Sequence, residues 1–243
     1  MQEQDKAKEI AFFSQSGKAG EYNVFTPKTN LKIVSKLLEM ANFSTSDNLL
    51  DLGCGSGIFT DAFYNLGYHN IKGFDLCPEL IDRAKLLNPN IDFRVADIEK
   101  LPIDDNSIDG IVYSAVLHHF PDTTKVFKEA YRILKPGGKL VAFDPNRNNP
   151  FMWLYRDKDS PLYSNVGVTE NERPILITEL QKALTEANFA ASFDYLSGLE
   201  YVYVKSNIAK YFLPIYNLID NLVFDNNLLH ARKAFIITCA AKN

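Results

Sequence analysis

The fold of this chain is decided by the stretch Leu49-Leu50-Asp51-Leu52-Gly53-Cys54-Gly55-Ser56-Gly57-Ile58-Phe59-Thr60. An apolar run breaks into glycines and then resumes with helical spacing, which predicts a strand, a tight turn and a helix. Glycine allows positive φ and has no Cβ atom, so a ligand can approach the main chain of this turn closely. We therefore expect a binding site here, although glycine-rich turns also close ordinary strand-to-helix connections.

The turn departs from the dinucleotide-binding pattern. The pattern G-x-G-x-x-G requires glycine at position 58, where this sequence has Ile58, and it usually holds a pyrophosphate. Asp51 stands two residues before the first glycine, and its carboxylate would repel a phosphate but attract a cation. S-adenosylmethionine carries an ammonium and a sulfonium group and no phosphate, so the turn favours this cofactor.

Two further carboxylates follow predicted strands. Residues 71–76 predict a second strand that ends at Asp75, the position where such folds bind a ribose diol. A third strand at 91–95 leads to Asp97, which could accept a hydrogen bond from an adenine amino group. Each acid alone is typical of a helix N-cap or a solvated loop. Three acids in register along one sheet edge indicate a nucleoside ligand.

Short apolar runs alternate with helical patterns from residue 48 to residue 144. Such alternation requires right-handed crossovers and predicts a doubly wound parallel sheet, with ligands at the carboxyl ends of its strands. The expected strands lie near 48–52, 71–75, 91–95, 108–113 and 139–144, followed by 191–196 and a terminal strand at 234–240. Expected helices include 3–14, one that starts at Thr26-Pro27, 122–134 and 176–188.

The chain resembles a class I S-adenosylmethionine-dependent methyltransferase of the small-molecule, methyltransferase type 11-like group. The resemblance covers residues 45–145. Its matching pieces are Leu50-Asp51-Leu52-Gly53-Cys54-Gly55-Ser56-Gly57, Phe74-Asp75, Ala96-Asp97-Ile98, Asp109 to Phe120, and Leu134-Lys135-Pro136-Gly137-Gly138. The resemblance implies a Rossmann-like sheet of seven strands, mostly parallel, with helices on both faces and an antiparallel last strand between the fifth and sixth.

The resemblance also implies which residues hold the cofactor. The glycine turn with Asp51 would hold its methionine part, Asp75 its ribose and Asp97 its adenine. The full set of cofactor-binding residues expected is Asp51, Gly53, Cys54, Gly55, Gly57, Asp75, Leu76, Asp97, Ile98 and Ser114.

Methyl transfer is an in-line displacement at a sulfonium carbon, so the protein mainly has to align the nucleophile, exclude water and sometimes remove a proton. His119 and Asp144 are the candidate catalytic residues, with His119 as a general base. Histidines at this position also suit a structural role, with a hydrogen bond to the backbone or packing on the cofactor. Tyr22, His118, Asn146 and Arg147 are the candidate substrate residues.

One domain of 243 residues is expected, with N-terminal helices and a lid at 1–44 and a cofactor-binding core at 45–144. Two segments, 145–175 and 198–229, interrupt the regular pattern and are rich in aromatic residues. We expect both to cover the substrate. An interface is the alternative for the first, and a dimer face or a membrane-surface contact for the second.

Composition narrows the class of partner. A net charge of −4 provides no broad basic field, so a small-molecule acceptor is expected and nucleic acid is not. Cys54, Cys77 and Cys239 lack metal-ligand spacing, and free thiols suit a reducing compartment, so we expect no metal and a cytoplasmic location. No stretch predicts an integral membrane segment, and a homodimer through the aromatic segments is an open alternative.

Two other functions compete with methyl transfer. A nicotinamide-dependent oxidoreductase would use the same fold, and the glycine spacing argues against it. A non-catalytic cofactor-binding partner protein would use the two aromatic segments as an interface.

Overall fold

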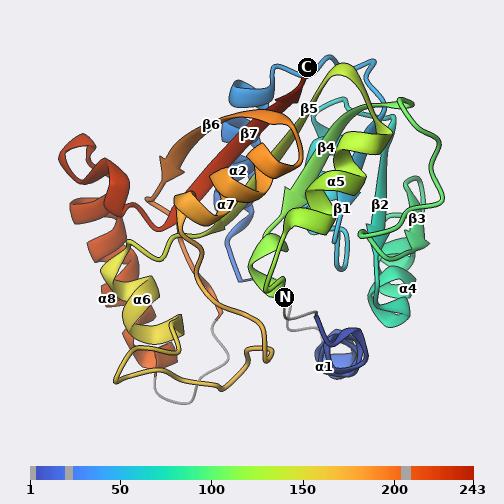
Figure 1. Ribbon diagram of the computed structural model, residues 1–243. Coiled ribbons are helices and arrows are strands. Elements are labelled where there is room, and N and C mark those ends of the chain that lie inside the picture. Colours follow the sequence, from blue (N-terminus) through green and yellow to red (C-terminus); the bar gives the residue numbers. More distant parts are fainter. Residues whose placement is uncertain (1–3, 20–23, 204–208) are drawn as a thin grey trace.

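The computed structural model describes residues 4–19, 24–203 and 209–243, which form a twisted sheet between layers of helices (Figure 1). The sheet has seven strands in the order β3-β2-β1-β4-β5-β7-β6. The strands are β1 Leu49–Leu52, β2 Ile71–Asp75, β3 Asp92–Val95, β4 Ile108–Ser114, β5 Leu134–Pro145, β6 Phe189–Leu196 and β7 Phe235–Lys242. Strands β1 to β5 are parallel, and β7 runs antiparallel between β5 and β6. The predicted fold class is therefore confirmed.

Helices join the strands and cover both faces of the sheet (Figure 1). The α-helices are α1 Lys6–Ala19, α2 Pro27–Ala41, α3 Ile58–Asn65, α4 Pro78–Leu87, α5 Thr124–Ile133, α6 Pro150–Arg156, α7 Ile177–Glu186 and α8 Leu213–Ile219. Short 3₁₀ turns occur at η1 Leu117–His119, η2 Ala209–Phe212 and η4 Asn227–Arg232, and a π-helical turn at η3 Asp220–Phe224.

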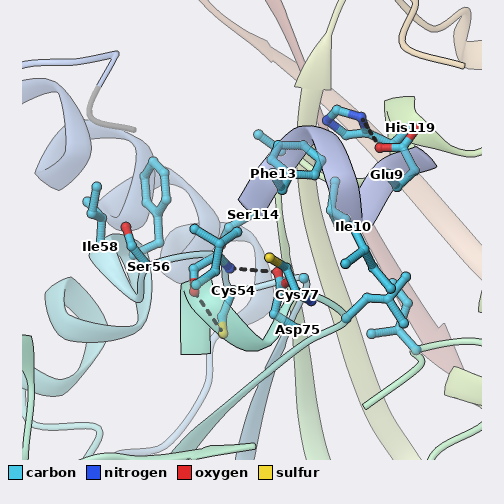
Figure 2. A pocket seen from close by; sticks show the side chains of 18 of the residues that line it. Glu9, Ile10, Phe13, Cys54, Ser56, Ile58, Asp75, Cys77, Ser114 and His119 are labelled. Atoms are coloured by element: carbon cyan, nitrogen blue, oxygen red, sulfur yellow. Dashed lines mark hydrogen bonds and ion pairs between the residues drawn. The ribbon is translucent and has the colours of Figure 1, made fainter. Parts of the chain in front are cut away.

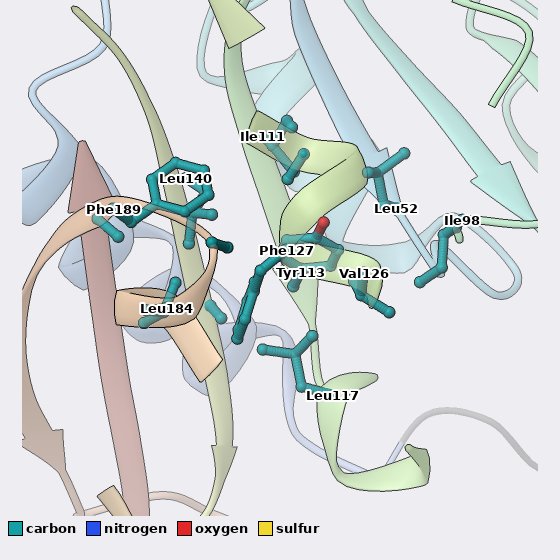
Figure 3. Close-up of a cluster of buried hydrophobic side chains, with 14 of the residues drawn as sticks. Leu52, Ile98, Ile111, Tyr113, Leu117, Val126, Phe127, Leu140, Leu184 and Phe189 are labelled. Atoms are coloured by element: carbon teal, nitrogen blue, oxygen red, sulfur yellow. The ribbon is translucent and has the colours of Figure 1, made fainter. Parts of the chain in front are cut away.

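Alternation along the strands divides the core into two layers. Leu50 and Leu52 of β1 pack on the face covered by α5 and α7, where Phe127 and Leu184 are fully buried. Figure 3 shows Leu52, Phe127 and Leu184 in this layer. Leu49 points to the opposite face and packs with side chains of α2 and α3. Asp51 lies on that second face too, because side chains two residues apart share a face of a strand. The buried layers therefore place one carboxylate inside the core, directly behind the glycine turn.

The sequence predicts the start of helix α2 correctly but the start of strand β5 too late. Helix α2 begins as predicted: Thr26 accepts a hydrogen bond from the main-chain N–H of Thr29, and Pro27 occupies the first helical position. Strand β5 begins at Leu134, five residues before the expected start, because the chain turns extended directly at the end of α5. The residue before Pro136 is disfavoured in the helical region, which helps the helix to stop there.

Helix α1 runs to Ala19, beyond the expected end near residue 14. The expected end rested on Ser16-Gly17, which have low helix propensity. The turn before this stretch is held on α4, where the Ser14 hydroxyl donates to Glu79 at 2.7 Å. Propensity is a weak predictor of where a helix ends.

Candidate functional site

The glycine turn between β1 and α3 is packed on two sides and open on a third. The φ angles are +78° at Gly53, +54° at Gly55 and +82° at Gly57. A Cβ at Gly53 would lie 2.4 Å from Val116, and one at Gly57 would lie 2.7 Å from the Phe93 ring. A Cβ at Gly55 would meet no described atom within 4 Å. The main chain at Gly55 is therefore where a ligand can come closest.

The open side of the turn borders a cavity of about 220 Å³ at the carboxyl ends of the parallel strands (Figure 2). This is the point where the strand order reverses between β1 and β4, which is where open α/β sheets bind ligands. The predicted residues that line the cavity are Gly53, Cys54, Gly55, Asp75, Leu76, Asp97, Ile98, Ser114 and His119. The turn, the two strand-end acids and the candidate histidine thus meet in one site.

Asp75 fixes the shape of the turn. Its carboxylate accepts hydrogen bonds from the main-chain N–H of Gly55 at 2.9 Å and of Cys77 at 2.8 Å. Burial raises the pKa of Asp75, and these two hydrogen bonds oppose that rise. One side chain therefore links the glycine turn to the start of α4 and also faces the cavity.

Asp51 does not line the cavity; it lies behind the turn with none of its surface exposed. It accepts a hydrogen bond from the Thr60 hydroxyl of α3 at 2.7 Å. Burial raises the pKa of Asp51 to about 6; the hydrogen bond from Thr60 lowers it, and the charge of Asp75 raises it further. A cation placed in the cavity would favour the ionised form of both acids.

Asp97 meets a lysine from the N-terminal helix. Lys6 of α1 forms ion pairs with Asp97 at 2.5 Å and with Glu99. The other oxygen of Asp97 accepts from the Glu99 main-chain N–H at 3.0 Å. Each carboxylate oxygen has two lone pairs, so Asp97 retains the capacity to accept a further donor from a ligand.

Helix α1 covers the cavity. Its residues Glu9, Ile10 and Phe13 line the cavity, and Figure 2 shows them facing the glycine turn from the opposite side. The Lys6 ion pairs and the contact of Ser14 with Glu79 hold α1 against β3 and α4. The N-terminal region is therefore part of the site.

His119 lies where α1, η1 and the 145–175 segment meet. Its Nδ1 lies 3.2 Å from the Thr169 hydroxyl and 3.5 Å from Oε2 of Glu9, and its ring stands edge-on to Phe13. Burial opposes the imidazolium form, but Glu9 and Glu172 favour it more strongly, so the pKa of His119 is raised. The raised pKa weakens His119 as a resting proton acceptor and suits it to stabilise negative charge.

His118 and Asp144 form a second polar pair, outside the lining of the cavity. Oδ1 of Asp144 accepts from the His118 main-chain N–H at 3.1 Å and lies 2.9 Å from the imidazole Nδ1. Burial raises the pKa of Asp144 to about 8 and lowers the pKa of His118 well below its usual value. The contacts between His118 and Asp144 therefore hold η1 against the end of β5.

The structure keeps the other predicted substrate residues away from the cavity. Asn146 is fully buried, and its amide donates to the main-chain oxygens of Ala231 and Lys233. Arg147 pairs with Asp157 and with Asp159. Asn146 therefore connects the 145–175 segment to the chain before β7, whereas Arg147 forms ion pairs within the segment. Tyr22 lies outside the described residues.

Sequence reasoning expected a lid within residues 1–44 but named none of the α1 residues that line the cavity. Glu9, Ile10 and Phe13 come from a region before the motifs, and only a helical pattern over 3–14 hinted at a packed helix. Nothing in that pattern tells which part of the sheet the helix covers. Phe25 and Phe120 also line the cavity without any preceding motif.

The middle part of the chain is similar in sequence to known methyltransferases. Residues 50–142 match a family model described as a methyltransferase domain. A ubiquinone biosynthesis O-methyltransferase from Xanthomonas oryzae is 34% identical over 122 residues, which are 48% of this chain and 49% of that protein. The chain spans about half the length of the curated relatives it matches.

Solved structures share the fold over most of the chain. An S-adenosylmethionine-dependent methyltransferase from Thermotoga maritima, described as a possible histamine N-methyltransferase, superposes with a TM-score of 0.61 at 18% identity and 90% coverage of both chains. A geranyl diphosphate C-methyltransferase from Streptomyces coelicolor, solved with S-adenosyl-L-homocysteine bound, gives 0.61 at 16% identity, covering 87% of this chain and 78% of that one.

Proposed function

We propose that this chain, which has the fold and the matched domain of a class I S-adenosylmethionine-dependent methyltransferase, transfers a methyl group to a small-molecule acceptor. The observation that carries this proposal is the charge around the cavity. Asp75 and Asp97 line it, and the buried Asp51 lies behind it with a raised pKa. A cationic ligand is the chemistry that three carboxylates around one cavity favour.

The residues fit S-adenosylmethionine in shape as well as charge. The main chain at Gly55 is open to a ligand, and Asp75, at the end of β2, stands where related folds hold a ribose diol. Leu76, Ile98 and Phe120 supply apolar surface for a flat base. When bound, this cofactor supplies a methyl group on a positively charged sulfur.

The chain's own residues would align the acceptor and exclude water. The main chain at Gly55 with Asp75 and Asp97 would hold the cofactor, whose methyl group the acceptor atom would receive in line with the sulfur. A proton lost by the acceptor passes to the Glu9 carboxylate. His119, 3.5 Å from Glu9, steadies the negative charge on the acceptor side.

The lining of the cavity supports an acceptor with an apolar body and one polar group. Ile10, Phe13, Val24, Phe25 and Phe59 line it beside Glu9 and His119. A net charge of −4 gives no basic field for nucleic acid. We therefore favour a small, partly apolar acceptor.

We also propose that the protein works in the cytoplasm. The support is that Cys54, Cys77 and Cys239 are all free thiols, which a reducing compartment maintains. Among the described helices, none has the length and apolar character needed to cross a bilayer. We also propose that the segments 145–175 and 198–229 cover the acceptor, with a homodimer through them as the alternative.

Transfer of a labelled methyl group tests the proposed function. The protein is incubated with methyl-labelled S-adenosylmethionine and pools of phenols, alcohols, amines, thiols and activated carbon acids. We expect label in one pool, and Glu9→Gln should lower kcat for that pool while leaving S-adenosylhomocysteine affinity within about threefold, because Glu9 acts on the acceptor side. Lasting absence of transfer by a protein that binds the cofactor would favour the non-catalytic alternative.

A further inference from the structure

The segment from η2 to η4 presents apolar side chains to solvent. Leu218 is 57% exposed, Leu222 70% and Leu228 91%. We define the apolar surface by its exposed members Phe212, Ile215, Leu218, Leu222, Val223 and Leu228. The spacing of 212, 215, 218 and 222 puts them on one side of α8 and η3, because residues three and four apart share a helix face. This side is an apolar stripe of the kind that normally faces a core.

The inner side of the same helices is firmly held. Tyr216 and Phe224 contact the ring of Phe151 in α6 at centroid distances of 5.5 and 5.9 Å. Asp220 is buried and accepts from the Ser197 hydroxyl at 2.9 Å and the Leu199 main-chain N–H at 3.0 Å. The fold therefore fixes which side of α8 and η3 faces outward. Figure 1 shows α8 beside α6 at the edge of the molecule, far from the central strands.

One positive charge next to the apolar surface has no acidic partner among the described residues. Arg232, at the end of η4, is exposed and has no carboxylate of the described chain within ion-pair distance. Within 209–232 the acids are Asp220, which is buried, and Asp225, which pairs with Lys32 and Lys233. Arg232 also borders a surface hollow with Trp153 and Arg147. An apolar stripe flanked by uncompensated positive charge suits a surface with an apolar interior and a negative rim.

We propose that the apolar surface docks on a lipid bilayer that carries anionic headgroups, with α8 and η3 lying in its interface. A second copy of the chain is the competing occupant. Within 209–232 the acids are buried or already paired, so a second copy offers Arg232 no free carboxylate from this surface, whereas an anionic bilayer pairs with Arg232 and accepts the leucines. In Figure 1, α6 and α8 lie beyond the same end of the sheet as α1, which covers the cavity.

Cosedimentation with vesicles tests the proposal on the full chain. Vesicles of phosphatidylcholine alone are compared with vesicles that also contain phosphatidylglycerol. The test variant is Leu218→Glu with Leu222→Glu, and the control is Leu86→Glu, a leucine 81% exposed on α4. We expect binding to the anionic vesicles only, a loss of at least about tenfold in the double variant, and binding within about twofold of the original in the control.

A second variant and a second method keep the test decisive. Arg232→Gln alters no buried group and should weaken vesicle binding several-fold, and added salt should do the same for the unmodified chain. The proposal is overturned if the unmodified chain ignores both kinds of vesicle, or if the double variant binds as well as the control. It is equally overturned if sedimentation velocity without lipid shows a dimer that Leu218→Glu abolishes, since the surface would then join two copies. None of these readouts requires methyl transfer.

Discussion

Replacing Asp51 with asparagine should make the protein more stable and its cofactor site weaker. Burial raises the pKa of Asp51 from 3.8 to about 6, so the fold penalises its ionised form. At about 1.4 kcal/mol per pKa unit, ionised Asp51 costs roughly 3 kcal/mol at pH 7.5. Asparagine removes the charge and can still accept from the Thr60 hydroxyl, which donates to Asp51 at 2.7 Å. The free energy of unfolding should therefore rise by up to about 3 kcal/mol.

The stability gained by Asp51→Asn should increase with pH. Because the pKa of Asp51 is higher in the folded than in the unfolded chain, the unfolded chain releases its proton first as pH rises from about 4 to 6. Stability of the original protein therefore falls across this window. The advantage of Asp51→Asn should be about 3 kcal/mol at pH 7.5, roughly half of that at pH 5, and smaller still at pH 4. Urea denaturation followed by circular dichroism measures it.

Asp51→Asn should lower the affinity for the cofactor. Removing the unit charge behind the cavity costs on the order of 1–2 kcal/mol of attraction to a bound cation at an effective dielectric of about 20, which weakens binding roughly tenfold. Asp82→Asn, on the exposed side of α4, is the control and should change neither quantity. A variant that is less stable than the original by the same amount at pH 5 and pH 7.5 would refute the argument, since Asp51 would then serve the fold as an ordinary hydrogen-bond acceptor.

Three further changes probe the turn, its packing and its cover. Asp75→Asn replaces one acceptor for Gly55 and Cys77 with a donor, so S-adenosylhomocysteine affinity measured by calorimetry should fall about 10- to 100-fold; an unchanged affinity would exclude Asp75 from the site. Gly73→Ala places a Cβ 2.4 Å from the Phe93 ring and should lower the unfolding free energy by about 1–3 kcal/mol in urea; equal stability would show that the ring yields freely. Lys6→Gln removes two ion pairs of α1, so its amides should exchange hydrogen faster without cofactor; unchanged exchange would mean that packing alone holds the helix.

The core and its acids could be predicted because the deciding interactions are local in sequence. Strand, turn and helix at residues 49–60 each follow from their own spacing, and parallel strands necessarily bring Asp75 and Asp97 to one edge of the sheet. The final antiparallel strand came from the resemblance, since apolar content alone sets no direction for β7.

The parts that sequence reasoning did not reach depend on contacts between distant segments. Glu9 meets His119 only because α1 packs beside α4 and covers the cavity opposite the glycine turn. The position of Asn146 after a strand suggested a substrate residue, but its amide donates a hydrogen bond to the main-chain oxygen of Ala231, which lies far away in the sequence. The 198–229 segment predicted buried apolar surface, whereas half of α8 faces outward, because helical spacing shows that a face is apolar but not what covers it.

The central claim is that the acidic cavity beside the glycine turn binds a cationic nucleoside amino acid rather than a dinucleotide. Calorimetric titration of the unmodified chain with S-adenosylmethionine, and separately with NAD, tests this claim most directly. The account predicts saturable binding of one S-adenosylmethionine per chain and no heat of binding with NAD. Saturable binding of NAD without binding of S-adenosylmethionine would contradict it.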